Sequence, residues 1–238
     1  MKRLITLAAL VVVAMSASAQ FDKGSFSIQP KIGIGSAFIT NMPDLREDVS
    51  DLGVPGVTGV IDLTRSVFPA FLAGFEAEYQ VADKVGLAAG LTYSLEGGSW
   101  KSVHRGSLFI ESPSYALGYL NLPIVANFYV VEGLALKAGI QFGFLTNANL
   151  RMKVEYNDPT NPANQISKRV KESIIDDARR FRCCIPVGLS YEFEDPHFVL
   201  DLRYHIDLTR INKDVEETGN LRNSSVLLTL GYKFNLSD

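Results

Sequence analysis

Apolar side chains alternate with small or polar ones along most of this chain, and no other feature constrains the fold as strongly. In the segment VGLAAGLTYSLEGG, residues 85–98, every second residue from Val85 to Leu95 is apolar. A period of two is typical of a β-strand with two unlike faces. The same pattern fills eight segments, approximately residues 25–38, 67–81, 85–98, 115–130, 134–147, 181–193, 197–211 and 224–234.

The connections between these segments alternate in length. Tight turns at residues 82–84, 131–133 and 194–196 alternate with long polar connections at residues 39–66, 97–114, 148–180 and 212–223. Short turns at one end and long loops at the other are typical of outer-membrane barrels. We therefore predict an all-β fold, an eight-stranded antiparallel up-and-down transmembrane β-barrel. Its short turns and both termini would be periplasmic, and its long loops extracellular.

The side chains indicate which face of the strands lies inside. The interior of an eight-stranded barrel is just wide enough for side chains to fill, so small residues should collect there. Many glycines fall on the polar face, namely Gly33, Gly35, Gly74, Gly86, Gly90, Gly139, Gly143, Gly188 and Gly231. The apolar face carries almost no charge and would contact lipid. A soluble, lipocalin-like barrel would instead expose the glycines to water, where they contribute nothing.

The first residues resemble a secretory signal peptide. Lys2 and Arg3 precede the apolar run LITLAALVVVAM, and the small residues of Ala17–Ala19 form a cleavage site. We expect residues 1–19 to be removed and residues 20–238 to form a single outer-membrane barrel domain. The net charge of −3 gives no reason to expect a nucleic-acid partner. A helix across residues 112–131 is disfavoured by Pro123 and by the alternation of apolar residues around two asparagines.

Charged residues on the inward face form the clearest candidate cluster. Counting along each strand from the short-turn end brings six of them to the lower and middle interior, namely Lys31, Glu76, Glu78, Lys137, Asp201 and Arg203. Because an unpaired buried charge is costly, we expect a structural salt-bridge cluster that plugs the barrel. A proton or ion pathway is the functional alternative.

A second polar group lies nearer the long-loop end and consists of Glu96, Arg182, His205 and Asp207. A histidine near an acid allows acyl-transfer or deacylase chemistry if a nucleophile lies within hydrogen-bond reach. His104, with Ser102 and Ser107 nearby in the sequence, offers the same alternative. The adjacent Cys183 and Cys184 are expected to be unpaired. No metal site and no cofactor is expected.

The third long connection contains Ile166, Val170 and Ile174 at a spacing of four residues. This spacing predicts a short amphipathic helix. Such a helix would fold over the barrel mouth, or contact a partner protein or a surface sugar.

Four stretches, YLNLPIVANFYV (residues 119–130), LKAGIQFGFL (136–145), LDLRYHIDLTRI (200–211) and LLTLGYKF (227–234), resemble the PorT-like outer-membrane β-barrel family of Bacteroidota-type bacteria. The resemblance implies an eight-stranded barrel, supplies no catalytic residues, and associates the name-giving member with type IX protein secretion. We expect a loop-presenting outer-membrane protein with a structural or interaction role in a secretion or envelope assembly. Its partners would be the outer-membrane bilayer and an envelope protein. A lipid-modifying enzyme is the main alternative, and a narrow channel a less favoured one.

Overall fold

The computed structural model describes residues 23–48, 59–157, 165–194, 197–214 and 219–236. The predicted signal peptide, residues 1–19, lies outside the described residues. Among the described residues, no helix is long and apolar enough to cross a membrane. Residues 112–131, where a helix was the alternative, lie within a strand.

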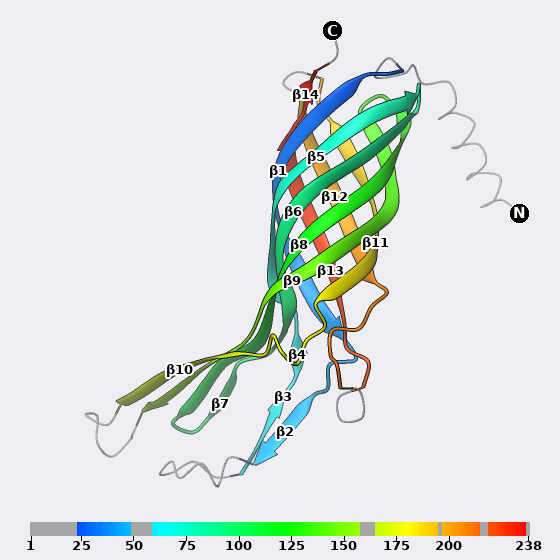
Figure 1. Ribbon diagram of the computed structural model, residues 1–238. Helices are drawn as coiled ribbons and strands as arrows, with labels where there is room; N and C mark the ends of the chain where they lie inside the picture. Colours follow the sequence, from blue (N-terminus) through cyan, green and yellow to red (C-terminus); the bar gives the residue numbers. More distant parts are fainter. Residues whose placement is uncertain (1–22, 49–58, 158–164, 195–196, 215–218, 237–238) are drawn as a thin grey trace, which may run out of the picture.

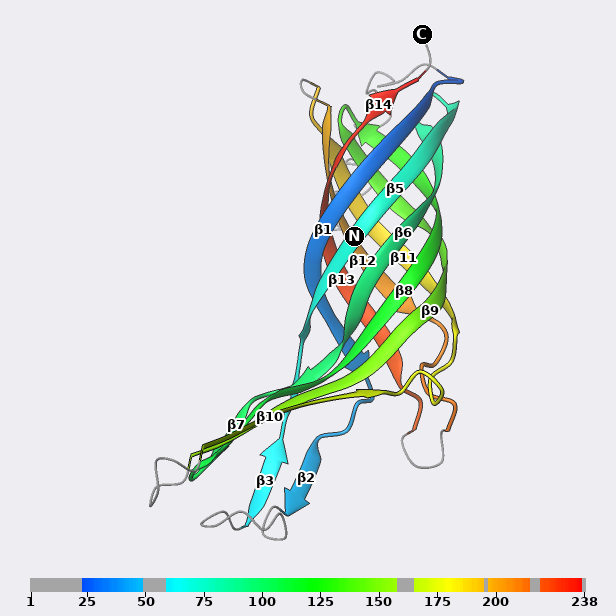
Figure 2. The same ribbon diagram turned by 60° about the vertical axis from the view of Figure 1, so that its left-hand side comes forward.

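Eight long strands form a closed antiparallel ring, in the order β1–β5–β6–β8–β9–β11–β12–β13, and β13 pairs back to β1. The ring confirms the predicted eight-stranded up-and-down barrel, and Figures 1 and 2 show the strands tilted around it. The ring strands are β1 (Phe26–Thr40), β5 (Phe68–Ala82), β6 (Val85–Trp100), β8 (Leu108–Val131), β9 (Leu134–Asn157), β11 (Phe181–Glu192), β12 (Phe198–Asp207) and β13 (Arg222–Tyr232). The shorter strands are β2 (Leu45–Asp48), β3 (Val60–Leu63), β4 (Arg65–Ser66), β7 (Val103–Arg105), β10 (Gln165–Ser173) and β14 (Phe234–Asn235).

The two faces of the ring are oriented as the alternation predicts. Along β12, the exposed fraction is 0% for Asp201, 40% for Leu202 and 4% for Arg203. The exposed wall is apolar on every ring strand, with Ile34 on β1 and Phe144 on β9 among its most exposed side chains. Polar side chains therefore fill the lumen, and the apolar side chains form a wall suited to contact acyl chains.

Glycines allow the strands to coil tightly around a narrow lumen. A Cβ atom added to Gly139 would lie 2.1 Å from the carbonyl oxygen of Ile124 on β8, and one added to Gly74 would lie 2.3 Å from that of Leu91 on β6. Neither carbonyl can move without breaking the hydrogen-bond ladder between strands. Glycine is therefore required at these two positions by the close approach of the neighbouring strand.

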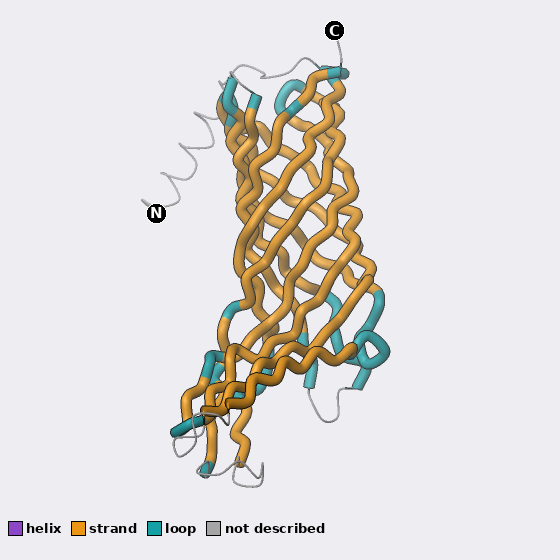
Figure 3. Tube along the Cα trace, turned by 90° about the vertical axis from the view of Figure 1, so that its left-hand side faces the viewer, coloured by secondary structure: helices purple, strands orange, loops and turns teal. Residues whose placement is uncertain are grey.

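The described parts of the long connections contain more strand than the sequence predicts. Strands β8 and β9 each run for 24 residues, and their far ends continue beyond the ring (Figure 1). There they pair with β7 and β10 to form a four-stranded extension, while β2 and β3 form a separate hairpin. In Figure 3 the coloured tube at this end consists of strands and loops, and no part of it is drawn as helix. The predicted amphipathic helix is wrong, because Gln165–Ser173 form the edge strand β10 on β9, and Ile174 follows that strand in no helix.

Candidate functional site

Five of the six predicted lumen charges meet in one cluster, here called the middle cluster. Arg203 binds Glu76 through Nη1–Oε1 and Nη2–Oε2 contacts of 2.6 and 2.7 Å, and it also binds Asp201. Lys31 Nζ lies 2.5 Å from Glu76 Oε1, and Lys137 Nζ lies 2.9 Å from Asp201 Oδ2. All five side chains are buried. The paired, bidentate geometry compensates each charge inside the tube.

The sixth residue, Glu78, belongs to a different group nearer the short turns. Lys233 Nζ lies 3.0 Å from Glu78 Oε2, 3.2 Å from Glu192 Oε2 and 3.0 Å from the Tyr129 hydroxyl oxygen. The Tyr129 hydroxyl in turn donates to Glu78 Oε1 at 2.7 Å. His197 reaches Glu192 at 3.5 Å. Sequence reasoning left out Lys233, Glu192 and Tyr129, although all three lie on the polar face of their strands.

The outer-rim group forms a third layer of contacts. Arg182 joins two carboxylates, with Nε–Oδ1 2.7 Å to Asp207 and Nη1–Oε1 3.1 Å to Glu96. Asn223 donates to the second Glu96 oxygen at 2.8 Å. The Arg182 guanidinium also lies over the Tyr119 ring, 4.8 Å from its centroid. The Arg182–Glu96 contact joins β11 to β6 and the Asn223–Glu96 contact joins β13 to β6, so strands that are not neighbours in the ring are tied together, whereas Arg182 and Asp207 lie on adjacent strands.

The histidines do not form an exposed catalytic group. His205 lies within the lumen, 2% exposed, and its Nδ1 is 3.3 Å from Ser225 Oγ, which is itself buried. His104 lies outside the ring on β7 and stacks on Phe109, with ring centroids 4.4 Å apart. The Ser102 hydroxyl is bonded to Ser112, not to His104. Cys183 and Cys184 are free thiols.

Between the charged layers and the long-loop end of the barrel, the interior changes to an apolar core, here called the mouth core. Trp100 is 3% exposed and donates its indole N–H to the Pro43 carbonyl oxygen at 3.0 Å. Leu63 of the β2–β3 hairpin packs in the same core. The buried members are Ile39, Met42, Ile61, Leu63, Trp100, Leu108, Ile110, Leu117, Tyr119, Leu145, Ala148, Tyr156, Ala178 and Ile211. This core explains why the long connections are ordered, since they bury apolar area against one another.

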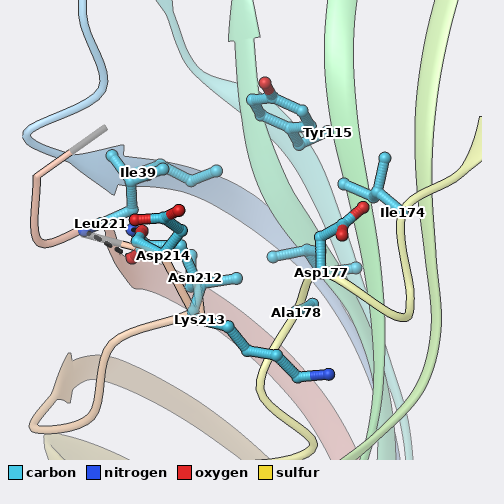
Figure 4. A pocket seen from close by; sticks show the side chains of 11 residues that line it. Ile39, Tyr115, Ile174, Asp177, Ala178, Asn212, Lys213, Asp214 and Leu221 are labelled. Carbon is cyan, nitrogen blue, oxygen red and sulfur yellow. Dashed lines mark hydrogen bonds between the residues drawn. The ribbon is translucent and has the colours of Figure 1, made fainter. Parts of the chain in front are cut away.

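A pocket of about 330 Å³ opens beside the mouth core (Figure 4). Tyr115 and Ile174 line one part of it, and Ile39 and Leu221 line another. Charged residues at the rim come from two separate connections, and Lys213 there donates to the Asp176 carbonyl oxygen. The rim residues are Asp177, Lys213 and Asp214. The pocket is apolar inside and charged at its edge, which suits a small amphipathic molecule.

The extension of the sheet beyond the ring is here called the arm, and it consists of β7, residues 108–114 of β8, residues 150–157 of β9, and β10. One face contributes Ile110, Met152 and Val154 to the mouth core or to its edge. The opposite face is charged, and a groove of about 340 Å³ crosses it. Hydrogen bonds to Glu155 and Glu111 hold the pKa of Lys153 on this face above its ordinary value. One face of the arm therefore packs against the mouth core, and its opposite face is accessible to solvent.

Comparison with known proteins places this architecture in a family. Residues 18–212 match the family described as outer membrane protein beta-barrel domain. The chain belongs to this family. It is an outer-membrane β-barrel protein, and the predicted location is confirmed. The match spans seven of the eight ring strands and ends before β13.

Solved barrels of other bacteria are more distantly similar to this family member. Neisserial surface protein A has 13% identity and a TM-score of 0.41, with 89% of this chain and 100% of that chain covered. OprG from Pseudomonas aeruginosa has 12% identity and a TM-score of 0.39, with 90% and 98% covered. Ail of Yersinia pestis has 14% identity and a TM-score of 0.36, with 90% and 100% covered. No curated protein matches the chain.

Proposed function

We propose that this protein is a surface-exposed binding module in which the barrel is a closed anchor and the outer structure does the binding. The observation that carries the proposal is the ordering of the long connections into an arm and a hairpin over the mouth core. A chain that needed only an anchor would have no reason to stabilise so much structure outside the membrane. Ordered outer strands reduce the entropy that a loop loses on binding.

The lumen supports the role of an anchor. Ion pairs join opposite walls in the middle cluster and at Arg182, and an eight-stranded ring leaves little space beside them. A water-filled pore would require those side chains to leave paired positions in a region shielded from solvent, at a cost of several kcal/mol for each ion. The narrow channel is therefore the less favoured alternative.

Lipid chemistry is also less favoured. The His205–Ser225 pair lies inside the closed lumen, whereas acyl chains would contact the outer wall. A serine nucleophile must reach both its base and the substrate carbonyl. His104 lies on the arm, and its ring stacks on Phe109. The described contacts of His205 and His104 include no serine on the lipid-facing wall.

For the partner, we extend the proposal to a protein of a secretion or envelope assembly. Support comes from the four sequence stretches that resemble the PorT-like family of Bacteroidota-type bacteria. The proposal includes export through the signal peptide of residues 1–19 and an orientation with the arm outside the cell. In this orientation the arm and the mouth pocket face possible partners.

The test uses photo-crosslinking in the native outer membrane. A crosslinkable residue at position Glu172 on β10 is compared with one at Ile140, which lies on the lipid-facing wall. We expect a discrete protein adduct from position 172 and none from position 140.

Two results would overturn the proposal. Equal adducts from positions 140 and 172 would assign the contact to the barrel wall instead of the arm. Discrete conductance steps of the purified protein in planar bilayers would show that the lumen is a pore.

A further inference from the structure

The charged face of the arm carries like charges in register. On the β9–β10 pair, Arg151 lies directly opposite Lys171, and Lys153 lies directly opposite Arg169. The four side chains share one face, because positions two residues apart on a strand point the same way. Like charges directly opposite each other destabilise a sheet. These two pairs are here called the like-charge rungs. They destabilise the pairing of the edge strand β10 with β9, and the fold itself does not require them.

Local acids compensate only part of this charge. Lys153 Nζ lies 2.9 Å from Glu111 Oε2 and 2.7 Å from Glu155 Oε1. Within the described part of the chain, Arg151, Arg169 and Lys171 form no salt bridge, and all three are exposed. The groove between the strands is lined by these four cations and Glu111, with Ser112, Met152 and Val170 as its uncharged members. The groove therefore has a net positive charge.

The spacing of the cations suits a ligand with repeated negative charges. Neighbouring strands lie about 4.8 Å apart, and residues two positions apart on a strand are separated by about 6.6 Å. The four cations thus form a small rectangular array. The two arginines can bind a carboxylate, phosphate or sulfate group through two parallel hydrogen bonds.

The position of the groove separates it from the bilayer. Phe144 is an exposed aromatic residue of β9 near the long-loop end of the wall, and Arg151 and Lys153 follow it seven and nine residues later. At about 3.3 Å per residue, this is roughly 23–30 Å along the strand, and the height above the wall is smaller because the strand is tilted. The interfacial layer of one leaflet is only about 7 Å thick. Figures 1 and 2 show the arm leaving the barrel beyond its wall.

We propose that the charged face of the arm binds an acidic polysaccharide outside the cell, whose sugars carry carboxylate, phosphate or sulfate groups. Arg151, Arg169 and Lys171 are the ligand-binding residues, and Lys153 completes the array. The proposal rests on the proposed function only in requiring the arm to lie outside the membrane. It adds a ligand class to the partner protein considered above.

The decisive variant is the double substitution Arg169→Glu and Lys171→Glu. It replaces both like-charge rungs by opposite-charge pairs with Lys153 and Arg151, so the arm should become more stable, not less. The matched control is Lys168→Glu, which changes the charge on the same strand but lies opposite Val154 on the other face. Any loss of binding in the double variant therefore cannot be attributed to unfolding of the arm.

Binding is measured on the full-length protein in detergent micelles, with alginate and dextran sulfate as probes and uncharged dextran as the blank. We expect wild type and Lys168→Glu to bind both acidic polymers, with affinity falling as salt rises. The double variant should bind at least about tenfold more weakly, since two of the four cations reverse sign.

Three results would overturn the inference. They are no binding by wild type, equal weakening in both variants, or binding of polyglutamate or of anionic lipid vesicles that exceeds binding of the polysaccharides. Failure of the proposed function would look different, because position 172 would then give no adduct beyond that of position 140. An adduct specific to position 172, together with absent polysaccharide binding, would overturn this inference alone.

Discussion

Arg203 and Glu76, 127 positions apart in the sequence, face each other in the lumen and form two parallel hydrogen bonds of 2.6 and 2.7 Å. The pair joins β12 to β5, which are not neighbours in the ring. Such a contact bridges the lumen, in addition to the ladder hydrogen bonds that hold neighbouring strands. Four predictions follow from this arrangement and from the ordered outer structure.

Loss of the bridging guanidinium should destabilise the barrel strongly. In Arg203→Met, Glu76 keeps only Lys31, and Asp201 loses its closest partner. We expect the free energy of unfolding to fall by about 3–5 kcal/mol, because two buried carboxylates lose their charge-assisted hydrogen bonds to the guanidinium. Urea unfolding in micelles, followed by the heat-dependent mobility of the folded barrel in gels, measures the change. Arg46→Met, at an ion pair whose side chains are 75% exposed, should cost about 1 kcal/mol or less.

A side chain at Gly139 should obstruct the strand pairing of β9 with β8. In Gly139→Val the Cβ atom would meet the Ile124 carbonyl oxygen, so the ladder must shift. We expect a loss of at least about 1–3 kcal/mol and a lower yield of folded barrel. The neighbouring Ala138→Val points to lipid and should fold normally. Equal yields of the two variants would contradict the close approach of these strands.

The single tryptophan of the chain reports on the mouth core. Because Trp100 is buried and its indole is hydrogen-bonded to Pro43, its emission should be blue-shifted and weakly quenched by acrylamide. Leu63→Asp places a charge in the same core and should shift the emission to the red. The barrel itself should keep its folded mobility in gels. Emission typical of a water-exposed indole in the wild type would contradict the ordered mouth.

Substitution of either histidine should leave membrane lipids unchanged. His205 is enclosed with Ser225, and His104 stacks on Phe109. Mass spectra of lipid A and phospholipids are compared between cells carrying the empty vector, the wild type, His205→Ala and His104→Ala. We expect four equivalent acyl-chain patterns. A pattern that the wild type creates and either variant abolishes would establish lipid chemistry and reject the binding module as the main role.

The inward position of most lumen residues could be predicted from the sequence, but which of them contact one another could not. The polar face of each strand follows from the period of two, so the inward position of Asp201 and Arg203 could be inferred from the sequence. Counting from the turns also brought Lys31, Glu76 and Lys137 to similar heights. Glu78, also counted into the lower to middle interior, pairs with Lys233, which contacts Glu192 as well, and not with the middle cluster. Strands are staggered around a tilted barrel, so equal counts along two strands do not mean equal heights.

The outer structure was predictable only in its position. Long polar connections indicated one end of the barrel, but the spacing of Ile166, Val170 and Ile174 indicated a helix where β10 forms. In isolation, a segment of this kind fits both a helix and a strand. It forms a strand here because the edge of β9 offers hydrogen-bond partners to its backbone.

By itself, the sequence determined the eight strands of the ring, the face that each turns to lipid, and the end at which the long connections lie. Those properties are local, because side chains alternate along any strand whatever it pairs with. Only the tertiary structure decided which lumen charges meet, where the apolar mouth core closes the barrel, and that two like-charge rungs lie on the arm. The first two depend on the register between strands that are distant in sequence around the closed ring, and the third depends on the register of β10 along the edge of β9.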